Sequence, residues 1–494
     1  MARKTTEYRL SDYLFNPITL IGLGLIIFSV AMIGALQLIQ MVASTSIPYG
    51  GMVAFVILPP FFMLGLVLVP IGIWRQRRRL ARKGRPEDKF FKMDFSIPKH
   101  RLYFQGFVVL SFVVLMVTVT LSYQGFHYTE SVEFCSSCHT VMDPEATTHQ
   151  LSPHARVKCV ECHVGPGAEW YVRSKMSGLY QVYATVMNKY PQPIETPIHN
   201  LRPARDTCEQ CHWPQFFIDD KVVQRDYFMR NEANTNGSIT LQMHVGGHPE
   251  YGRPTGIHWH VENEVYFQAS DKKEEQIPWI LVRYADGSER VFRDDGVEGA
   301  DQPDPDHPVH RMDCVDCHNR PSHIFRSPRE IMDSLMASRS VSSELPDIRA
   351  LGADLMAEPY ETVEDAEARI RGGIRNAYEK LEGDMKPEID QAEESIMKGY
   401  RRNFFPYMKV NWEVHPSNIG HMRSAGCFRC HDGLHVDEAG EPISRACNLC
   451  HTILAQQQTG LEDRFDIKGV PFQHPEDIGG AWEEMSCNEC HTGI

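Results

Sequence analysis

The pentapeptide Cys135-Ser136-Ser137-Cys138-His139 has the pattern Cys-x-x-Cys-His, which the 494-residue chain contains seven times, here numbered motif 1 to motif 7. The copies use all 14 cysteines: Cys135, Cys138, Cys159, Cys162, Cys208, Cys211, Cys314, Cys317, Cys427, Cys430, Cys447, Cys450, Cys487 and Cys490. A histidine closes each copy: His139, His163, His212, His318, His431, His451 and His491. No cysteine is left for a disulfide framework.

The spacing within each motif suits covalent attachment of a haem. Two thiols can add to the two vinyl groups of one macrocycle, and the histidine that follows can bind the iron from the proximal side. Two other uses of the pattern are zinc ribbons, which pair two Cys-x-x-Cys units per metal, and thioredoxin-like redox pairs, which need no histidine. A histidine in the fifth place of all seven copies favours haem. We therefore predict seven covalently bound haems c, each with a proximal histidine.

Apolar segments precede the first motif. Residues 13–74 contain no Asp, Glu, Lys, Arg or His, which leaves room for two membrane spans of ~20 residues each. We place these spans at about 14–40 and 53–74, and a third span at about 103–123. A cleaved signal peptide is the alternative for the first span, but an apolar core of ~7–15 residues would be shorter than this run.

The loop between the second and third spans is basic. Residues 75–101 contain eleven Lys or Arg and three acidic residues. By the positive-inside rule such a loop lies in the cytoplasm. Haem is joined to Cys-x-x-Cys-His motifs outside the cytoplasm. We therefore predict a multi-pass protein of the bacterial inner membrane, with its N-terminus inside and its haem domain in the periplasm.

Charge is distributed unevenly along the chain. Residues 1–103 contain 14 Lys or Arg and 5 Asp or Glu, which leaves 36 basic and 59 acidic side chains for the rest. An acidic electron carrier is steered towards basic docking surfaces, so basic periplasmic c-type cytochromes are the expected partners and nucleic acid is not. Plain solubility is the alternative explanation of the acidic balance.

Two long stretches without cysteine separate the motifs. Residues 213–313 are predicted to be mostly β, with a hairpin at Trp279–Phe292 that turns at Asp286-Gly287. Pro328–Arg402 has helical spacing, and Thr362 or Asp365 can cap one of its helices.

The expected fold class is a membrane-anchored multihaem cytochrome c. Three N-terminal transmembrane helices precede a periplasmic domain of loops and short helices around seven c-haems, with a β-rich insert and a helical insert. Little regular structure is expected at 135–212 and 427–494, because haems supply much of the core there. The predicted segments are 1–52 (tail, first span and outer turn), 53–102 (second span and basic loop), 103–124 (third span), 125–214 (three-haem domain), 215–310 (β-rich insert), 311–326 (fourth haem site), 327–410 (helical insert) and 411–494 (C-terminal three-haem domain).

The histidine count bears on the second axial ligands. Of 23 histidines seven are proximal, and the spare ones outside the membrane suffice for low-spin haems with two histidine ligands each. The candidates for the distal position are His154, His199, His244, His258, His260, His310, His323, His421, His435 and His474. A surface or hydrogen-bonding role is the alternative for each of these, and it is the expected role for His248, His307 and His415.

The first haem has a different candidate. Met142 follows His139 by three residues, and a methionine ligand raises the haem potential relative to a second histidine. The alternative is a methionine that fills an apolar gap near the membrane.

Several elements between the third span and about Pro214 resemble one known family. They are Phe134–His139, His149 and His154 before Val157–His163, the amphipathic Trp170–Met176, and Leu201-Arg202-Pro203 before motif 3. They resemble the NapC/NirT family of membrane-bound, quinol-oxidising cytochromes. With seven motifs and three spans, the whole chain is similar to the heptahaem inner-membrane cytochromes of metal-reducing bacteria. The resemblance implies menaquinol oxidation and electron transfer to periplasmic cytochromes, in anaerobic or extracellular respiration.

The resemblance also implies a quinol pocket. The family uses a lysine on the helix after the second motif, and Lys175 occupies that place, where it would hydrogen-bond a quinol oxygen. The family's acidic partner about two turns later is missing, and Gln181 and Val182 stand there instead. The family's methionine follows the first motif histidine by two residues, whereas Met142 follows by three. A lysine that only reaches the membrane interface is the alternative for Lys175.

The predicted activity is that of a quinol:cytochrome c oxidoreductase. One alternative is a non-catalytic relay or anchor subunit that receives electrons from another protein in a larger respiratory complex. A terminal reductase would need a haem with an open position and acid–base groups around it. The plentiful histidines, and the lack of any Cys-x-x-Cys-Lys variant in the sequence, disfavour that alternative.

Overall fold

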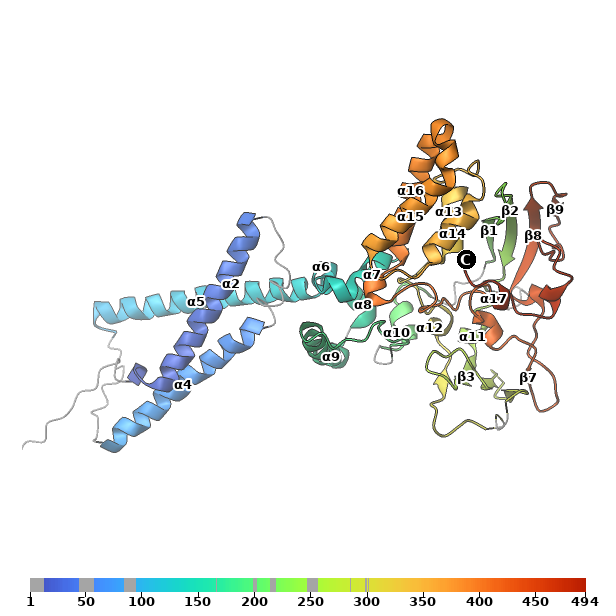
Figure 1. Cartoon of the computed structure of the whole chain (residues 1–494). Coiled ribbons are helices and arrows are strands. Elements are labelled where there is room, and N and C mark those ends of the chain that lie inside the picture. Colours follow the sequence, from blue (N-terminus) through green and yellow to red (C-terminus); the bar gives the residue numbers. More distant parts are fainter. Residues whose placement is uncertain are drawn as a thin grey trace, which may run out of the picture. The chain divides into compact units, whose positions relative to one another are not determined.

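The chain forms two compact units, Met1–Met142 (unit 1) and Asp143–Ile494 (unit 2), shown in Figure 1. The computed structural model describes residues 13–43, 57–83, 95–165, 167–198, 202–213, 219–246, 256–284, 286–297, 300 and 302–494. The predicted outer turn after the first span and much of the basic loop lie outside these residues.

Unit 1 is made of helices. They are α2 (Pro17–Ala43), α4 (Leu58–Lys83), α5 (Pro98–Thr129) and α6 (Val132–Cys135), followed by the start of α7 (His139–Gln150). Helices α2 and α4 pack against each other, and glycines let their backbones come close. A Cβ atom on Gly65 would lie 2.6 Å from the carbonyl oxygen of Gly22. Small residues allow this kind of close helix packing where lipid surrounds the pair.

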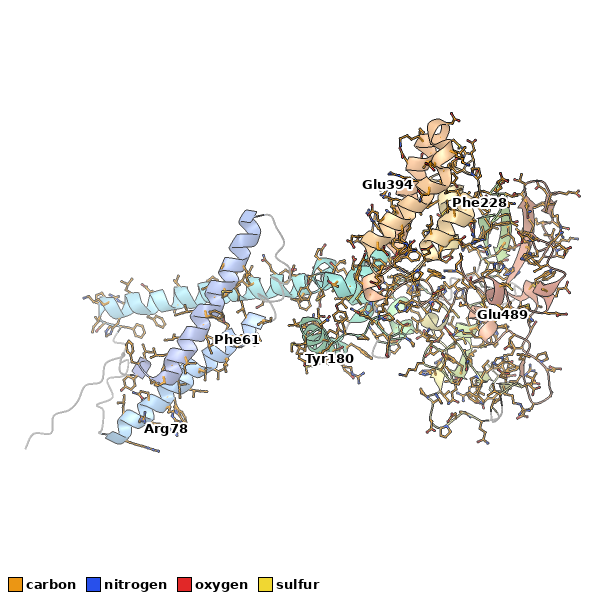
Figure 2. The ribbon with its side chains drawn as sticks, in the orientation of Figure 1. Phe61, Arg78, Tyr180, Phe228, Glu394 and Glu489 are labelled. Atoms are coloured by element: carbon orange, nitrogen blue, oxygen red, sulfur yellow. The ribbon has the colours of Figure 1, made fainter. Side chains whose placement is uncertain are left out.

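Two helices in the described part of the chain are long and apolar enough to cross a membrane. They cover Pro17–Leu36 and Leu58–Leu80, close to the first two predicted spans. Large apolar side chains point away from the pair, such as Phe61, which is 45% exposed (Figure 2). The third predicted span, 103–123, lies within the continuous helix α5, and its passage through a membrane stays a prediction.

Unit 2 contains two antiparallel sheets. The four-stranded sheet has the order β1-β2-β8-β9 and the five-stranded sheet the order β6-β3-β4-β5-β7. The strands are β1 (Lys221–Phe228), β2 (Asn236–Met243), β3 (Glu264–Gln268), β4 (Trp279–Arg283), β5 (Glu289–Asp294), β6 (His310–Arg311), β7 (His435–Val436), β8 (His451–Gln458) and β9 (Arg464–Phe465).

The predicted hairpin is confirmed as β4 and β5. Trp279 pairs with Arg293 and Arg283 with Glu289. Gly287 in the turn has φ of +84°, a conformation that glycine adopts without the steric cost that a side chain brings. The five-stranded sheet buries an apolar cluster, which includes Val265, Phe267, Ile280, Val282 and Phe292.

The expectation of little regular structure at 427–494 is wrong for β8. This strand begins at the histidine of motif 6 and pairs along its length with β2, from Met243↔His451 to Gly237↔Gln458. Ile453 and Ala455 alternate with more exposed residues and are buried, as expected of a strand with one covered face. Strand β1, which pairs with the other edge of β2, lies within the stretch that was predicted to be mostly β, although its bounds were not predicted.

The helical prediction for Pro328–Arg402 is confirmed. The helices are α13 (Pro328–Ala337), α14 (Ile348–Ala357), α15 (Val363–Tyr378) and α16 (Glu382–Asn403). The Thr362 side chain accepts a hydrogen bond of 3.1 Å from the Asp365 backbone N–H, so Thr362 is the N-cap of α15. Ile389, Ala392 and Ile396 keep helical spacing and are buried.

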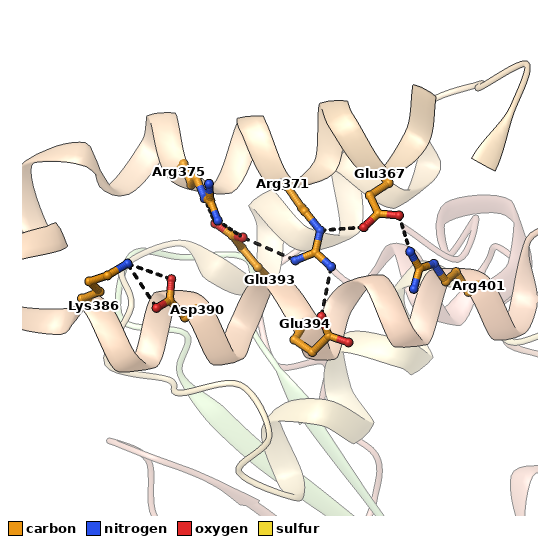
Figure 3. Close-up of polar contacts among 8 residues, drawn as sticks. All are labelled: Glu367, Arg371, Arg375, Lys386, Asp390, Glu393, Glu394 and Arg401. Carbon is orange, nitrogen blue, oxygen red and sulfur yellow. Dashed lines mark hydrogen bonds and ion pairs between the residues drawn. The ribbon is translucent and has the colours of Figure 1, made fainter. Parts of the chain in front are cut away.

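Ion pairs join α15 to α16 (Figure 3). Glu393 is only 1% exposed, and its carboxylate accepts from Arg375 Nε at 2.5 Å and lies 3.5 Å from Arg371 Nη1. Glu367 pairs with both Arg371 and Arg401. A buried carboxylate needs such partners, because an unpaired charge away from water is costly. The pairs therefore fix how the two helices meet.

Short elements carry the motifs and the segments between them. They are α8 (Cys159–His163), α9 (Ala168–Val186), α10 (Ala204–Cys208), α11 (Trp259–Glu262), α12 (Cys314–Cys317), α17 (Cys487–Cys490) and the 3₁₀ turns η6 (Gly426–Arg429) and η7 (Cys447–Leu449).

Candidate haem sites

The motifs of unit 2 form single helical turns. The N–H of His212 donates to the carbonyl of Cys208 at 2.8 Å, and that of His318 to the carbonyl of Cys314 at 2.8 Å. The same bond closes motifs 5 and 7. One turn of helix places residues i and i+4 on the same side, so the first thiol and the histidine of a motif share one face. None of the 14 cysteines forms a disulfide.

Six motif histidines are each faced by a second histidine ring. The distances between ring centres are 6.3 Å for His163–His323, 5.9 Å for His212–His154, 6.4 Å for His318–His258, 5.8 Å for His431–His260, 6.3 Å for His451–His421 and 6.1 Å for His491–His474. All six second histidines are among the predicted distal candidates.

These distances match the space that one metal ion needs between two imidazoles. A metal–nitrogen bond to histidine is ~2 Å long and the nitrogen lies ~1.1 Å from its ring centre, so two rings on opposite sides of one metal have centres ~6.2 Å apart. The six observed values all lie between 5.8 and 6.4 Å. The residues present therefore fit an iron atom between each pair of rings.

Hydrogen bonds define which ring nitrogen faces the motif. The Nδ1 atoms of five facing histidines lie against backbone carbonyls: His154 on Pro321 at 3.1 Å, His258 on Val245 at 2.8 Å, His260 on Ile257 at 2.8 Å, His323 on Glu145 at 3.0 Å and His474 on Glu476 at 2.8 Å. A carbonyl only accepts, so in His154, His258, His260 and His323 Nδ1 carries the proton and Nε2 is the unprotonated nitrogen of the neutral ring. This is the usual arrangement of a histidine that binds a metal through Nε2. His474 is different, because the Glu476 backbone N–H also donates to its Nδ1 at 3.2 Å.

Burial keeps several of these rings neutral. Desolvation lowers the pKa of His323 to about 4 and that of His491 to about 4. It also lowers the pKa values of His260 and His421. Neutral imidazole is the form that binds a metal. His491 differs from the facing histidines, because Arg329 Nη1 lies 2.7 Å from its Nδ1. A guanidinium only donates, so this contact suits the tautomer in which Nδ1 is unprotonated.

Motif 1 belongs to unit 1. The Met142 backbone N–H donates to the carbonyl of Cys138 at 3.0 Å, so Met142 continues the helical turn that follows the motif. The side chain of His139 lies outside the described residues. The role of Met142 as an axial ligand stays a prediction.

Among the residues that the structure describes, the distal candidates His244, His310 and His435 do not face a motif histidine. Both ring nitrogens of His244 have partners, with Nδ1 3.2 Å from Asp220 Oδ2 and Nε2 3.0 Å from Thr452 Oγ1. The ring of His310 packs 5.9 Å from that of Phe267. His199 and His248 lie outside the described residues.

His435 is also fully engaged in hydrogen bonds. It is 1% exposed, its Nδ1 lies 2.9 Å from Asp432 Oδ1 and its Nε2 lies 2.6 Å from the carbonyl oxygen of Ile277. Burial is the largest single influence and lowers the pKa of His435, but the Asp432 and Ile277 bonds and the Asp432 and Asp294 charges together outweigh it, so the pKa is raised above 6.5. Because both nitrogens of the His435 ring are hydrogen-bonded, we assign this ring a structural role.

We expect the substitution His435→Gln to lower stability in a pH-dependent way. Because the folded pKa of His435 is raised, its added stability is fully present below pH 6.5 and is lost as the pH rises through the folded pKa. Thermal unfolding of wild type and variant should therefore differ most below pH 6.5 and converge at alkaline pH. A visible spectrum identical to wild type is expected, and a new high-spin band would instead make His435 an axial ligand.

Two groups near the His163–His323 pair were not among the predicted site residues. Glu145 Oε2 lies 3.1 Å from His323 Nδ1, and the ring of His149 has its centre 6.2 Å from that of His323. His149 Nε2 contacts the carbonyl of Val157 at 2.9 Å, while its Nδ1 is buried without a partner. Only the family resemblance pointed to His149, and nothing in the local pattern marks Glu145.

The residues of the predicted quinol pocket lie on α9. Lys175 Nζ lies 5.0 Å from the ring centre of Tyr171, and Gln181 Nε2 donates to Ser177 Oγ at 3.3 Å. The helix also exposes apolar side chains, including Met176 and Tyr180 (Figure 2). Lys175 belongs to unit 2 and motif 1 to unit 1, so the pocket stays a prediction.

Apolar helices that can cross a membrane, together with Cys-x-x-Cys-His turns faced by second histidines, define a membrane-anchored multihaem cytochrome c. Proteins of this class carry covalently bound haem and transport electrons. The chain belongs to the NapC/NirT cytochrome c family, and the model of the family's N-terminal region matches residues 97–197.

Similar proteins support this assignment along most of the chain. The cytochrome c-type protein ImcH of Geobacter sulfurreducens is 41% identical over 493 residues, which cover 98% of this chain and 97% of that protein. The cytochrome c nitrite reductase subunit NrfH of Nitratidesulfovibrio vulgaris is 31% identical over 20% of this chain and 61% of its own length. The cytochrome c-type protein TorC of Escherichia coli K12 is 27% identical over 30% of this chain and 39% of its own length. No solved structure matches the chain.

Proposed function

We propose that this protein is a menaquinol dehydrogenase of the inner membrane that passes electrons through seven c-type haems to periplasmic cytochromes. The observation that carries the electron-transfer part is the set of six facing histidine pairs, with ring centres 5.8–6.4 Å apart. Two histidine ligands close both axial positions of an iron, which suits electron transfer and leaves no open position for a substrate. The terminal-reductase alternative is less well supported for this reason.

The chain's own residues have three tasks in this proposal. The motif cysteines hold the macrocycles, the motif histidines and their facing partners bind the irons, and backbone carbonyls orient the facing rings through Nδ1. His154, His258, His260, His323, His421 and His474 are the proposed distal ligands in unit 2, and Met142 is the proposed ligand at motif 1. When bound, the haems supply reversible one-electron redox chemistry at iron.

Quinol oxidation is assigned to α9. The ammonium group of Lys175 is proposed to donate a hydrogen bond to a quinol oxygen, and Gln181 lies on the same helix. Protons of the quinol leave to the periplasm. The family match at 97–197 includes this helix and supports the assignment. Exposed apolar side chains on α9, such as Met176 and Leu179, suit a site that a lipid-soluble quinol reaches from the membrane.

The proposed partners follow from charge and family. The region after residue 103 contains 59 acidic and 36 basic side chains, which favours basic periplasmic c-type cytochromes as acceptors. The two helices that can cross a membrane support an anchor in the inner membrane. We propose that unit 2 lies in the periplasm.

The proposal is tested by anaerobic mixing of the detergent-solubilised protein with a reduced menaquinone analogue, followed by haem absorbance. We expect Lys175→Ala to slow reduction at least about tenfold, because a hydrogen bond from a charged group contributes ~1.5–3 kcal/mol and ~1.4 kcal/mol is a factor of ten. Lys189→Ala is the matched control. Like Lys175, Lys189 contacts a tyrosine ring, with its Nζ 5.1 Å from the Tyr183 ring centre. Its loss should leave the rate unchanged.

Two outcomes would contradict parts of the proposal. Equal rates in wild type and Lys175→Ala would remove Lys175 from the pocket. Haems that stay oxidised with quinol in the wild type, yet are reduced by dithionite, would favour the relay subunit that receives electrons from another protein.

A further inference from the structure

We infer that motifs 2 to 7 stand next to one another in space in the order in which they occur along the chain. The inference rests on the proposed haem attachment but not on quinol oxidation. It is carried by five junctions, one between each motif and the next. At two of them a segment beside one motif supplies the facing histidine of its neighbour, and at a third one short segment supplies the facing histidines of both motifs.

Motifs 2 and 3 share the segment before motif 2. His154 precedes Cys159 by five residues, yet its ring faces His212 of motif 3 at 5.9 Å. Helices α8 and α10, which carry these two motifs, also pack against each other. Both sites must therefore lie within reach of one short loop.

Motifs 3 and 4 touch directly. Helices α10 and α12, which carry these two motifs, pack against each other, and the backbone N–H of Arg205 donates to Asp313 Oδ2 at 3.0 Å. These contacts join the turn before Cys208 to the cap of the turn that begins at Cys314. No other motif needs to lie between them.

Motifs 4 and 5 are joined by α11. His258 faces His318 at 6.4 Å, and His260, two residues later, faces His431 at 5.8 Å. Two residues of a chain span at most ~7 Å, so one short segment supplies ligands to two sites. Arg429 Nη2 also donates to the carbonyl of Asp316 at 2.6 Å and ties the two motifs together.

Motifs 5 and 6 exchange segments in the same way. His421 precedes Cys427 of motif 5 by six residues but faces His451 of motif 6 at 6.3 Å. His431 of motif 5 in turn places its Nδ1 2.8 Å from the carbonyl of Ser444, three residues before Cys447. Each site is thus built partly from the other's sequence.

Motifs 6 and 7 are joined by a smaller contact. Arg445 Nη2, two residues before Cys447, donates to the carbonyl of Met485, two residues before Cys487, at 3.3 Å. One further contact skips a site, because His323 follows motif 4 yet faces His163 of motif 2 at 6.3 Å. Motifs 2, 3 and 4 therefore form a tight group, and motifs 5, 6 and 7 extend from it.

Counted along this order, motif 7, Cys487–His491, is the last site. Motif 2 follows motif 1 in the chain and is the end nearest in sequence to the membrane anchor. Motif 7 also contacts the segment that follows motif 4, since Arg329 Nη1 lies 2.7 Å from His491 Nδ1.

Iron positions in the complete holo-protein test the order directly. An anomalous difference map at the iron edge, or a cryo-electron microscopy map, should show that the iron at each of motifs 3 to 6 has the irons of the preceding and following motifs among its nearest neighbours. An iron of motif 6 or 7 that lies closest to motif 2 or 3 would overturn the inference. This result does not depend on whether quinol reduces the protein.

A solution test uses the junction at α11. In the oxidised protein, His258→Met and His260→Met should each produce the absorption of one methionine-ligated haem. The double variant should show twice that absorption. A double variant with the signal of a single one would mean that both residues serve one haem, and the inference would fail. His310→Met is the matched control, since His310 faces Phe267 and no motif, and it should show no such absorption.

Discussion

Replacement of His421 by alanine is expected to convert about one seventh of the haem from low-spin to high-spin. His421 is the ring that faces His451, with centres 6.3 Å apart, and its Nδ1 is buried without a hydrogen-bond partner. Without the second imidazole the iron keeps one strong axial ligand, which favours the high-spin state. Absorption and electron paramagnetic resonance spectra of the oxidised protein measure the change. Its expected size is one seventh, because His421 faces one of seven motifs.

Two comparisons make this result specific. Added imidazole should restore the low-spin spectrum of His421→Ala, because the substitution leaves a cavity the size of an imidazole ring. His310→Ala should leave the spectrum as it is. Unchanged low-spin absorption in His421→Ala without imidazole would mean that another group binds the iron opposite His451.

Substitution of Asp333 by alanine should cost about 3–4 kcal/mol of stability. Asp333 lies in α13 and accepts from the Phe228 backbone N–H at 3.2 Å, and its Oδ1 lies 3.6 Å from Arg349 Nε. Arg349 is 2% exposed. Burial raises the pKa of Asp333 and lowers that of Arg349, while each charge opposes the shift of the other. Removal of the carboxylate would leave a buried guanidinium without its counter-ion.

The measurement is denaturant unfolding of the holo-protein, followed by far-ultraviolet circular dichroism. Asp390→Ala is the matched control, because its pair with Lys386 in α16 is exposed (Figure 3) and such pairs contribute less than ~1 kcal/mol. A loss at Asp333 no larger than that at Asp390 would show that water reaches Arg349 once the carboxylate is gone.

The motif residues were predictable because covalent chemistry fixes their spacing. A turn of helix between the first cysteine and the histidine follows from that spacing, as at Cys314–His318. The second histidines were recognisable as a group, since the chain has more histidines than motifs. Which one faces which motif was not predictable. His154 lies five residues from motif 2 but faces motif 3, because tertiary packing decides the pairing.

Two histidines show the limit of sequence distance as a guide. His435 lies four residues after motif 5 and looked as suitable as His421, but Asp432 and the Ile277 carbonyl hold both of its nitrogens. Strand β8 was missed for a related reason. We expected haems to take the place of regular secondary structure around the last three motifs. The strand instead begins at a motif histidine and pairs with β2.

The crossed pairs also bear on how the protein is assembled. Five of the six facing histidines, His154, His258, His260, His421 and His474, precede the motif that they face. In the proposed topology the chain after the membrane anchor crosses the membrane in sequence order, so each of these ligands reaches the periplasm before the cysteines that would capture the corresponding haem. The site at His163 is different, because His323 emerges 160 residues later. In the proposed topology His163 would therefore lack its facing ring until motifs 3 and 4 had also crossed the membrane.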